Sequence, residues 1–213
     1  MKYIIMCGGD YHTIIPKQLR VYDNGLTIIE RTIKFLQIAG VDDIAISTND
    51  DRFEWLGLPI LRHDNDFEYG NEERHSWLKA FYPMTEPCCY IFGDVFFSPQ
   101  AIKTIVDTET DSIEFFASAP PFSKDYFKEW AEPFAFKVQD TDLFFRKIRE
   151  CHQYDLEGRF HREAVSWELW QVIKGTPLDV IDYTNYTAIN DYTTDFDSEA
   201  EYQEFKRRMG RDV

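Results

Sequence analysis

Short apolar runs alternate with amphipathic stretches along the chain, and this alternation predicts its secondary structure. The apolar runs predict strands at residues 3–6, 43–47, 58–61, 88–92, 113–117, 134–138 and 178–181. The stretches between them carry apolar residues at helical spacing and predict helices at residues 27–39, 72–81, 99–106, 143–152, 163–174 and 198–209. Strands that alternate with helices are typical of a mostly parallel sheet covered by helices. We therefore expect an α/β, Rossmann-like fold with a mostly parallel mixed sheet and helices on both faces.

The segment from Pro120 to Glu132 departs from this alternation. It is rich in aromatic residues and has no clean period. We therefore expect a small irregular lobe over the sheet, within about residues 120–175. No repeat, linker or low-complexity segment divides the chain, and 213 residues suit one sizeable core. The sequence thus predicts one domain over residues 1–213.

The composition is that of a folded protein with an acidic surface. Hydrophobic residues make up 44% of the chain, and the formal net charge is −15. This apolar content excludes a disordered chain, and the negative charge argues against nucleic acid as a partner. A nucleotide still fits, because nearby backbone amides and a few cations outweigh a distant global charge. The acidity by itself is typical of a soluble protein.

The four cysteines predict neither a disulfide framework nor a zinc site. Cys88 and Cys89 lie within an apolar run, and no pair has the spacing of metal ligands. The apolar residues 3–7 are too few for a signal sequence, and no stretch approaches the length of a membrane span. We therefore expect a cytoplasmic protein with no membrane partner, as a monomer or homodimer.

The first candidate motif follows the first predicted strand. Cys7, Gly8 and Gly9 end this strand, and Pro16-Lys17 follows a few residues later. Glycines let a backbone approach a ligand and point its N–H groups at phosphate oxygens, and a lysine neutralises the same phosphates. The loop lacks the Gly-Lys-Ser/Thr ending of a Walker motif. The alternative is that the glycines only form a turn and that Lys17 is a solvated surface cation.

The second candidate is Asp94, which follows the apolar run 88–92 and Gly93. Open α/β sheets place ligand chemistry at the carboxyl ends of their strands. A carboxylate at such an end needs a cation or a helix N-terminus as its partner. We expect Asp94 to bind a metal ion. The alternative is that it caps the following helix, although Ser98 is better placed for that role.

The third candidate is the acidic segment near the C-terminal end of the sequence. Alternation along an extended chain would aim Asp195 and Asp197 to the same side. Mg²⁺ binds one or two carboxylates together with phosphate oxygens. We expect both aspartates to contribute to a Mg²⁺ site, while Asp197 or Ser198 is equally able to cap the last helix.

Together, these motifs resemble the GT-A-like nucleotidyltransferases, the group of sugar-phosphate, phosphocholine and methylerythritol-phosphate nucleotidylyltransferases. The resemblance spans essentially the whole chain, and its motifs stand in the family's order: Gly8-Gly9 with Pro16-Lys17, residues 27–40 with 44–46, residues 64–80 with Gly70-Asn71, Gly93-Asp94, and 195–198 with Tyr202. One departure is clear. The family's loop usually carries an arginine for the nucleotide phosphates, whereas residues 8–13 contain none, and His12 or Arg20 is left to supply that charge.

The resemblance implies a Mg²⁺-dependent enzyme that joins a nucleoside triphosphate to a phosphorylated small molecule and releases pyrophosphate, with CTP slightly favoured as the donor. It implies that Lys17 and Asp94 are catalytic and that Cys7, Gly8, Gly9, Lys17 and Asn71 bind the nucleotide. It also implies a metal site formed by Asp94, Asp195 and Asp197. Products of this kind are precursors of surface polysaccharides or lipids.

Aromatic residues and carboxylates occur together in two segments that are candidates for the acceptor site. Trp130 ends an aromatic and acidic segment, and Trp167 and Glu168 share a predicted helix. Aromatic faces beside acids suit a quaternary ammonium group such as that of phosphocholine, and sugar rings also stack on aromatic rings. We therefore expect Trp130, Trp167 and Glu168 to bind the acceptor. The alternative for the helix is an ordinary core stripe.

Two other functions are compatible with the sequence. A GT-A glycosyltransferase would use the same sheet, but such enzymes usually carry Asp-x-Asp where this chain has Gly93-Asp94-Val95-Phe96. A degenerate domain that binds nucleotide without turnover would explain the missing loop arginine.

Overall fold

The structure is a computed structural model that describes residues 1–8, 14–23, 25–62, 76–122, 130–196 and 198–209. Its centre is a sheet of seven strands: β1 (Lys2–Met6), β4 (Ile44–Ser47), β5 (Ile60–Leu61), β6 (Cys88–Phe92), β8 (Ile113–Ser118), β9 (Glu132–Val138) and β10 (Thr187–Ala188). The strand order is β10-β8-β9-β6-β1-β4-β5. β9 runs antiparallel to both of its neighbours, and the other pairs are parallel. The predicted mostly parallel, mixed sheet is confirmed.

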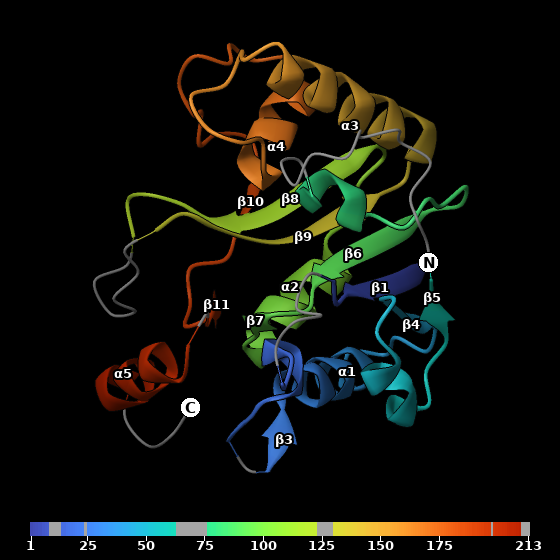
Figure 1. Ribbon diagram of the computed structural model, residues 1–213, viewed down its shortest axis with the longest axis vertical. Coiled ribbons are helices and arrows are strands. Elements are labelled where there is room, and N and C mark those ends of the chain that lie inside the picture. Colours follow the sequence, from blue (N-terminus) through green and yellow to red (C-terminus); the bar gives the residue numbers. More distant parts are fainter. Residues whose placement is uncertain (9–13, 24, 63–75, 123–129, 197, 210–213) are drawn as a thin grey trace.

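Helices cover both faces of this sheet. They are α1 (Ile28–Ile38), α2 (Pro99–Asp107), α3 (Thr141–Leu156) and α4 (Ser166–Lys174), whereas α5 (Glu199–Met209) lies apart from this sheet (Figure 1) and packs on Phe96 through Phe205. Figure 1 shows α3 and α4 on one side of β8 and β9, with α1 and α2 on the other side of the sheet. Three short 3₁₀ helices complete the set: η1 (Lys17–Leu19), η2 (Asp51–Leu56) and η3 (Ser76–Ala80). None of the helices in the described part of the chain is long and apolar enough to span a membrane.

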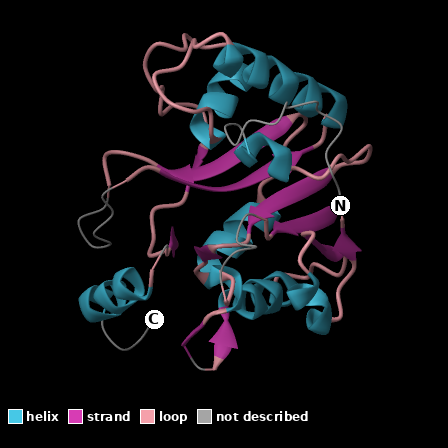
Figure 2. Ribbon diagram, in the orientation of Figure 1, coloured by secondary structure: helices cyan, strands magenta, loops and turns pink. Residues whose placement is uncertain are grey.

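Two small ribbons lie outside the main sheet (Figure 2). β2 (Val21–Asp23) pairs with β3 (Leu26–Thr27), and β7 (Val95–Phe96) pairs antiparallel with β11 (Thr194–Asp195). The second of these, here called the β7–β11 ribbon, joins the turn after β6 to the C-terminal part of the chain. It therefore brings Asp195 beside the segment that carries Asp94.

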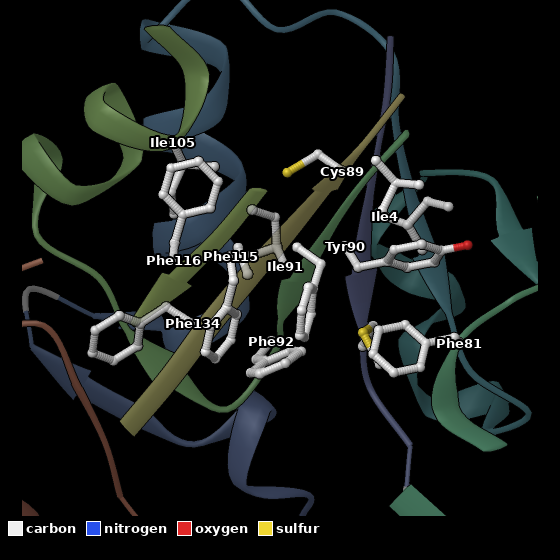
Figure 3. Close-up of a cluster of buried hydrophobic side chains, with 14 of the residues drawn as sticks. Ile4, Phe81, Cys89, Tyr90, Ile91, Phe92, Ile105, Phe115, Phe116 and Phe134 are labelled. Atoms are coloured by element: carbon white, nitrogen blue, oxygen red, sulfur yellow. The ribbon is translucent and has the colours of Figure 1, made fainter. Parts of the chain in front are cut away.

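The core consists of buried strands and a dense group of aromatic rings (Figure 3). Every residue of β6 is buried. Phe115 of β8 and Phe136 of β9 stack with ring centroids 4.5 Å apart, and Phe81 packs edge-on against Tyr90 at 5.1 Å. Each fully buried ring contributes about 2–3 kcal/mol to folding by leaving water. This core makes the sheet a rigid base for the loops at its edge.

Helix boundaries follow from capping side chains. The Thr27 hydroxyl accepts a hydrogen bond from Glu30 N, and the Glu30 carboxylate accepts one from Thr27 N, which forms a capping box for α1. The Ser98 hydroxyl accepts a hydrogen bond from Ala101 N at 2.8 Å and so begins α2. Since Ser98 caps this helix, Asp94 is not its N-cap.

Three of the predicted elements differ from the structure. Residues 178–181 are not a strand but a loop, because the Gln171 amide donates to the carbonyls of Pro177 and Val180 at 2.7 and 2.8 Å and holds the chain against α4. The last strand of the main sheet is β10 instead. The described part of the predicted helix 72–81 is the 3₁₀ helix η3, and the predicted strand 58–61 is limited to Ile60–Leu61.

Candidate active site

The candidate site lies where β1 and β6 end at the same edge of the sheet. These neighbouring strands are parallel, and Met6 stands opposite Phe92. The chain leaves β1 through Cys7 and Gly8 and leaves β6 through Gly93 and Asp94. The two loops touch, because Gly93 N donates to the Met6 carbonyl at 3.0 Å. The predicted nucleotide loop and the predicted metal aspartate therefore come from adjacent strands at the carboxyl edge, the usual ligand site of an open α/β sheet.

Gly93 is required by this close approach. A Cβ atom at this position would lie 2.4 Å from the Met6 carbonyl oxygen and 2.6 Å from the Cys7 sulfur. Cys7 is buried, and its burial, together with the negative charge of Asp94, raises the pKa of its thiol. Cys7 N also donates to the Ser47 carbonyl at 2.9 Å. The Cys7 side chain thus supports the loop by packing.

Lys17 and Asp94 meet at this edge as an ion pair. Lys17 Nζ lies 2.8 Å from Asp94 Oδ2, and the two side chains are 19% and 30% exposed. Lys17 begins η1, in which Leu19 N donates to the Pro16 carbonyl at 2.9 Å. The structure therefore brings together the two residues that the sequence proposes as catalytic. Lys17 is not a solvated surface cation.

Asp195 is held beside Asp94 by strand pairing. In the β7–β11 ribbon Asp195 stands opposite Val95, the residue that follows Asp94. Paired strands lie about 5 Å apart. Asp94 belongs to the turn before β7, so the alternating side-chain directions of a strand do not fix the direction of its side chain. Three of the predicted site residues, Gly9, Asn71 and Asp197, lie outside the described residues, as does His12.

A polar network fixes the ribbon to the start of α2. The Ser98 hydroxyl donates to the Asp191 carboxylate, which also accepts a hydrogen bond from Thr193 N at 2.7 Å. Ser98 N in turn donates to the Thr193 hydroxyl at 3.0 Å. These contacts hold β11 at the edge of the sheet.

The residues present fit a Mg²⁺ ion by their donor chemistry. Asp94 and Asp195 offer carboxylate oxygens on adjoining backbones. Mg²⁺ takes one or two carboxylates and completes its coordination with phosphate oxygens and water. No group of three or more potential metal-ligating side chains occurs among the described residues. Within the described part of the site, Asp94 and Asp195 are thus two carboxylates, a number that Mg²⁺ accepts when phosphate oxygens and water supply its other ligands.

Glu132 is a carboxylate at this edge that the sequence did not identify. It is the first residue of β9, and its Oε1 accepts a hydrogen bond from the Thr194 hydroxyl of β11 at 3.0 Å. Because β9 runs antiparallel to β6, it begins at the edge where β6 ends. The predicted strand began only at Phe134, and the direction of a strand is not visible in its apolar pattern. Trp130, two residues before Glu132, is 76% exposed.

Trp167 and Glu168 have structural partners in place of the expected role in acceptor binding. Trp167 is 2% exposed and packs edge-on against Phe115 at 5.0 Å, while its indole N–H donates to the Ala131 carbonyl. The Glu168 carboxylate accepts from Val165 N at the start of α4 and forms an ion pair with Arg162 at 2.6 Å. The alternative, a core stripe on this helix, matches these contacts. We therefore do not retain either residue as a candidate ligand of the acceptor.

Arg52 brings an arginine to the nucleotide loop from another element. It lies in η2, where it binds the Asp50 carboxylate and donates to the Ile14 carbonyl at 3.1 Å. The hydrogen bonds from Arg52 lower the pKa of Asp50 below its usual value. Residues 8–13 of the loop contain no arginine. The sequence alone did not indicate that an arginine of η2 would reach the loop at Ile14.

The comparisons with known proteins concern the fold. No family model and no curated protein matches the sequence. The structure is similar to the inositol-1-phosphate CTP transferase from T. maritima, with a TM-score of 0.53 and 14% identity over 97% of this chain and 95% of that chain. It is also similar to a putative glucose-1-phosphate thymidylyltransferase from Bacillus anthracis, with a TM-score of 0.57 and 14% identity over 100% of this chain and 96% of that chain. These likenesses show that the protein shares its overall fold with the two proteins.

Proposed function

We propose that the protein is a nucleotidyltransferase that transfers a nucleoside monophosphate from a nucleoside triphosphate to a phosphorylated small molecule. The observation that carries this proposal is the Lys17–Asp94 pair at 2.8 Å, placed where the loop after β1 meets the Gly93-Asp94 turn. A cation for polyphosphate and a carboxylate for a metal ion are thus side by side at the carboxyl edge. The shared fold with a CTP transferase and a putative thymidylyltransferase supports the same reaction class.

In the proposed reaction an oxygen of the acceptor phosphate attacks the α-phosphorus of the nucleotide. A new phosphoanhydride bond forms, the bond between the α- and β-phosphates breaks, and pyrophosphate leaves with the electron pair. A phosphomonoester has its second pKa near 6 and is already anionic at neutral pH, so no general base is needed. The protein then has to align the two phosphates and stabilise the developing charge.

The residues at the edge divide these tasks. Lys17 would exchange Asp94 for the phosphates of the bound nucleotide, and the backbone at Gly8 would line the same phosphates. Asp94, Asp195 and Asp197 would hold the metal, with Gly9 and Asn71 on the nucleotide. Mg²⁺ bound there would neutralise charge on the reacting phosphates.

For the acceptor we propose Trp130 and Glu132 in place of Trp167 and Glu168, within the lobe at about residues 120–175. The exposed Trp130 ring offers a stacking surface, and Glu132 brings a carboxylate to the strand that carries Asp195. This pair suits an amino-alcohol phosphate such as phosphocholine, by attraction of a cation to an aromatic face and an acid. It also suits a sugar phosphate, by ring stacking and hydrogen bonding. We keep CTP as the slightly favoured donor and assign the product to the synthesis of surface polysaccharide or lipid precursors.

All four cysteines are free and buried. This agrees with a reducing compartment, and we propose a cytoplasmic enzyme that acts as a monomer or homodimer on small molecules and does not bind nucleic acid.

The test is pyrophosphate release with Mg²⁺, each common nucleoside triphosphate, and a panel of phosphocholine, phosphoethanolamine, inositol 1-phosphate and sugar 1-phosphates. Asp94→Asn is expected to lower the rate at least a hundredfold. Asp43→Asn is the matched control, because Asp43 also pairs with a lysine, Lys2, which begins β1 at the end opposite the candidate edge.

Hydrolysis of a nucleotide sugar and calorimetric binding of nucleotide are measured beside this panel, and each outcome has a separate meaning. Release that requires one acceptor and is lost in Asp94→Asn supports the proposal and names the substrate. Cleavage of a nucleotide sugar without pyrophosphate release would instead favour a glycosyltransferase. Nucleotide binding that survives Asp94→Asn, with no product from any acceptor, would favour a binding domain without turnover.

A further inference from the structure

Arg31 of α1 contacts residues of two other segments of the chain. Its guanidinium lies 4.2 Å from the centre of the Phe96 ring and 4.6 Å from the centre of the Phe35 ring. Its Nε donates to the Phe97 carbonyl at 3.2 Å, and its Nη2 donates to the Tyr192 hydroxyl at 3.4 Å. One side chain thus joins α1 to two segments that are nearly a hundred residues apart in the sequence.

These contacts lie on β7 and just before β11, close in sequence to the proposed metal ligands Asp94 and Asp195. Phe96 belongs to β7, two residues after Asp94, and Tyr192 precedes β11, three residues before Asp195. The β7–β11 ribbon itself consists of only two paired residues on each strand. A ribbon of this length is not stable alone, so its geometry depends on what holds it from outside.

An arginine suits this task better than any other cation. Its planar guanidinium stacks on aromatic faces and donates hydrogen bonds in fixed directions, while a lysine offers a point charge on a flexible stem. Phe96 also packs against Phe196 and Phe205 of the C-terminal segment, with ring centroids 5.6 and 5.8 Å away. The Arg31 guanidinium therefore lies on a ring that is itself shared between β7 and the chain that follows β11.

We propose that Arg31 is a positioning residue that sets the spacing of the Asp94 and Asp195 carboxylates. In this role it acts through the β7–β11 ribbon. The inference rests on the proposed metal site. Residues that orient metal ligands without binding the metal typically contribute a factor of about 10–100 to metal affinity.

The test measures Mn²⁺ binding by electron paramagnetic resonance in the absence of nucleotide. We compare wild type, Arg31→Met, Arg31→Lys, Asp94→Asn and Lys174→Met. Lys174 is the matched control because its ammonium also fastens a loop to a helix, donating to the Asp182 and Thr184 carbonyls at 3.3 and 2.9 Å, on the part of the molecule that carries α4. The unfolding midpoint of each variant is measured in parallel.

We expect Arg31→Met to bind Mn²⁺ about tenfold more weakly than wild type, with Arg31→Lys between the two. Lys174→Met should lower the unfolding midpoint and keep wild-type Mn²⁺ affinity. Should Arg31→Met fail to fold, the milder Arg31→Lys carries the test alone.

Two results would overturn the inference while leaving the proposed function in place. One is wild-type Mn²⁺ affinity in the Arg31 variants when Asp94→Asn has lost binding. The other is an equal loss in Lys174→Met, which would show a general effect of stability. Binding that is absent in wild type or unchanged in Asp94→Asn would instead overturn the metal site and, with it, the role of Arg31.

Discussion

At the scale of single residues, the ion pair between Lys17 and Asp94 determines how the site responds to its ligands. Lys17 places a positive charge 2.8 Å from a carboxylate that we propose as a metal ligand. A metal ion that binds alone has to displace this lysine or tolerate its repulsion. A nucleotide and a metal that bind together give each member of the pair a new partner of opposite charge.

We therefore predict opposite effects of Lys17→Met on two ligands. The affinity for Mn²⁺ alone should rise roughly thirtyfold, because a single and a double positive charge about 4 Å apart repel each other by about 2 kcal/mol even at the dielectric constant of water. The affinity for nucleoside triphosphate should fall at the same time. Calorimetric titrations with each ligand measure both, with the exposed Lys34 as the control substitution to Met. Weaker Mn²⁺ binding in Lys17→Met would show that this lysine does not compete with the metal.

We predict that Gly93→Ala, which adds a single methyl group, destabilises the protein. In Gly93→Ala the new methyl group would overlap the Met6 carbonyl and the Cys7 sulfur, at 2.4 and 2.6 Å. The two loops would have to separate, at a cost of about 2 kcal/mol in the free energy of unfolding. Gly8→Ala is the matched control, because its added Cβ would meet nothing within 4 Å. Urea unfolding of both variants gives the comparison, and equal stability would refute the close approach.

Residues also show what their sequence pattern leaves open. Asp94 was recognisable because an acid after an apolar strand has no structural reason to be there. Trp167 and Glu168 had the chemistry of a binding site, but the same residues fill a core and cap a helix, and only packing distinguishes the two roles. Glu132 was missed because its importance depends on the direction of β9, which the alternation of apolar residues does not reveal.

At the scale of elements, η2 is tied to the nucleotide loop through Asp50 and Arg52. The hydrogen bonds from Arg52 lower the pKa of the Asp50 carboxyl in the folded protein relative to the unfolded chain. A carboxyl of lowered pKa adds stability above its unfolded pKa near 3.9, and this stability is lost as the pH falls toward the folded value. The contribution of the pair is thus complete at neutral pH.

We predict that Asp50→Asn makes the acid side of the stability curve less steep. The free energy of unfolding of wild type should fall more than that of the variant as the pH is lowered from about 5 to 3. Denaturant unfolding at a series of pH values provides this curve. Parallel curves for the two proteins would show that Arg52 does not perturb Asp50.

The elements differ in how far the sequence predicts them. β6 was predicted with its observed bounds, because a buried strand is a continuous apolar run between turns. The β7–β11 ribbon could not be predicted, since two residues carry no periodicity and their pairing depends on chain segments far apart in sequence. Residues 178–181 have the apolar content of a strand but form a loop, and the Gln171 amide donates hydrogen bonds to the carbonyls of Pro177 and Val180.

At the scale of the whole molecule, the core predicts the behaviour of every cysteine. Cys7, Cys88, Cys89 and Cys151 are free and buried. Burial raises the pKa of each thiol, to about 12 for Cys88. The thiolate is the reactive form, so the native protein should show almost no reaction with a disulfide reagent at pH 8. In denaturant all four thiols should react, and rapid reaction of any one in the native protein would contradict the packing of the core.

The whole fold also limits what similarity implies about activity. Two nucleotidyltransferase structures align with this chain over nearly its whole length, but at 14% identity the shared feature is the arrangement of strands and helices. Under the proposed function, the activity would come from the side chains at the carboxyl edge, above all the paired Lys17 and Asp94.

The most direct test follows the α-phosphorus of the nucleotide. Nucleoside triphosphate labelled at the α-phosphate is incubated with Mg²⁺ and the acceptor panel, with wild type and with Asp94→Asn. We predict that the label appears in a new diphosphate-linked product of one acceptor, with an equal amount of pyrophosphate, and that both are lost in Asp94→Asn. Label that stays in the triphosphate, or is released as free nucleotide whether or not an acceptor is present, would contradict a transferase built on Lys17 and Asp94.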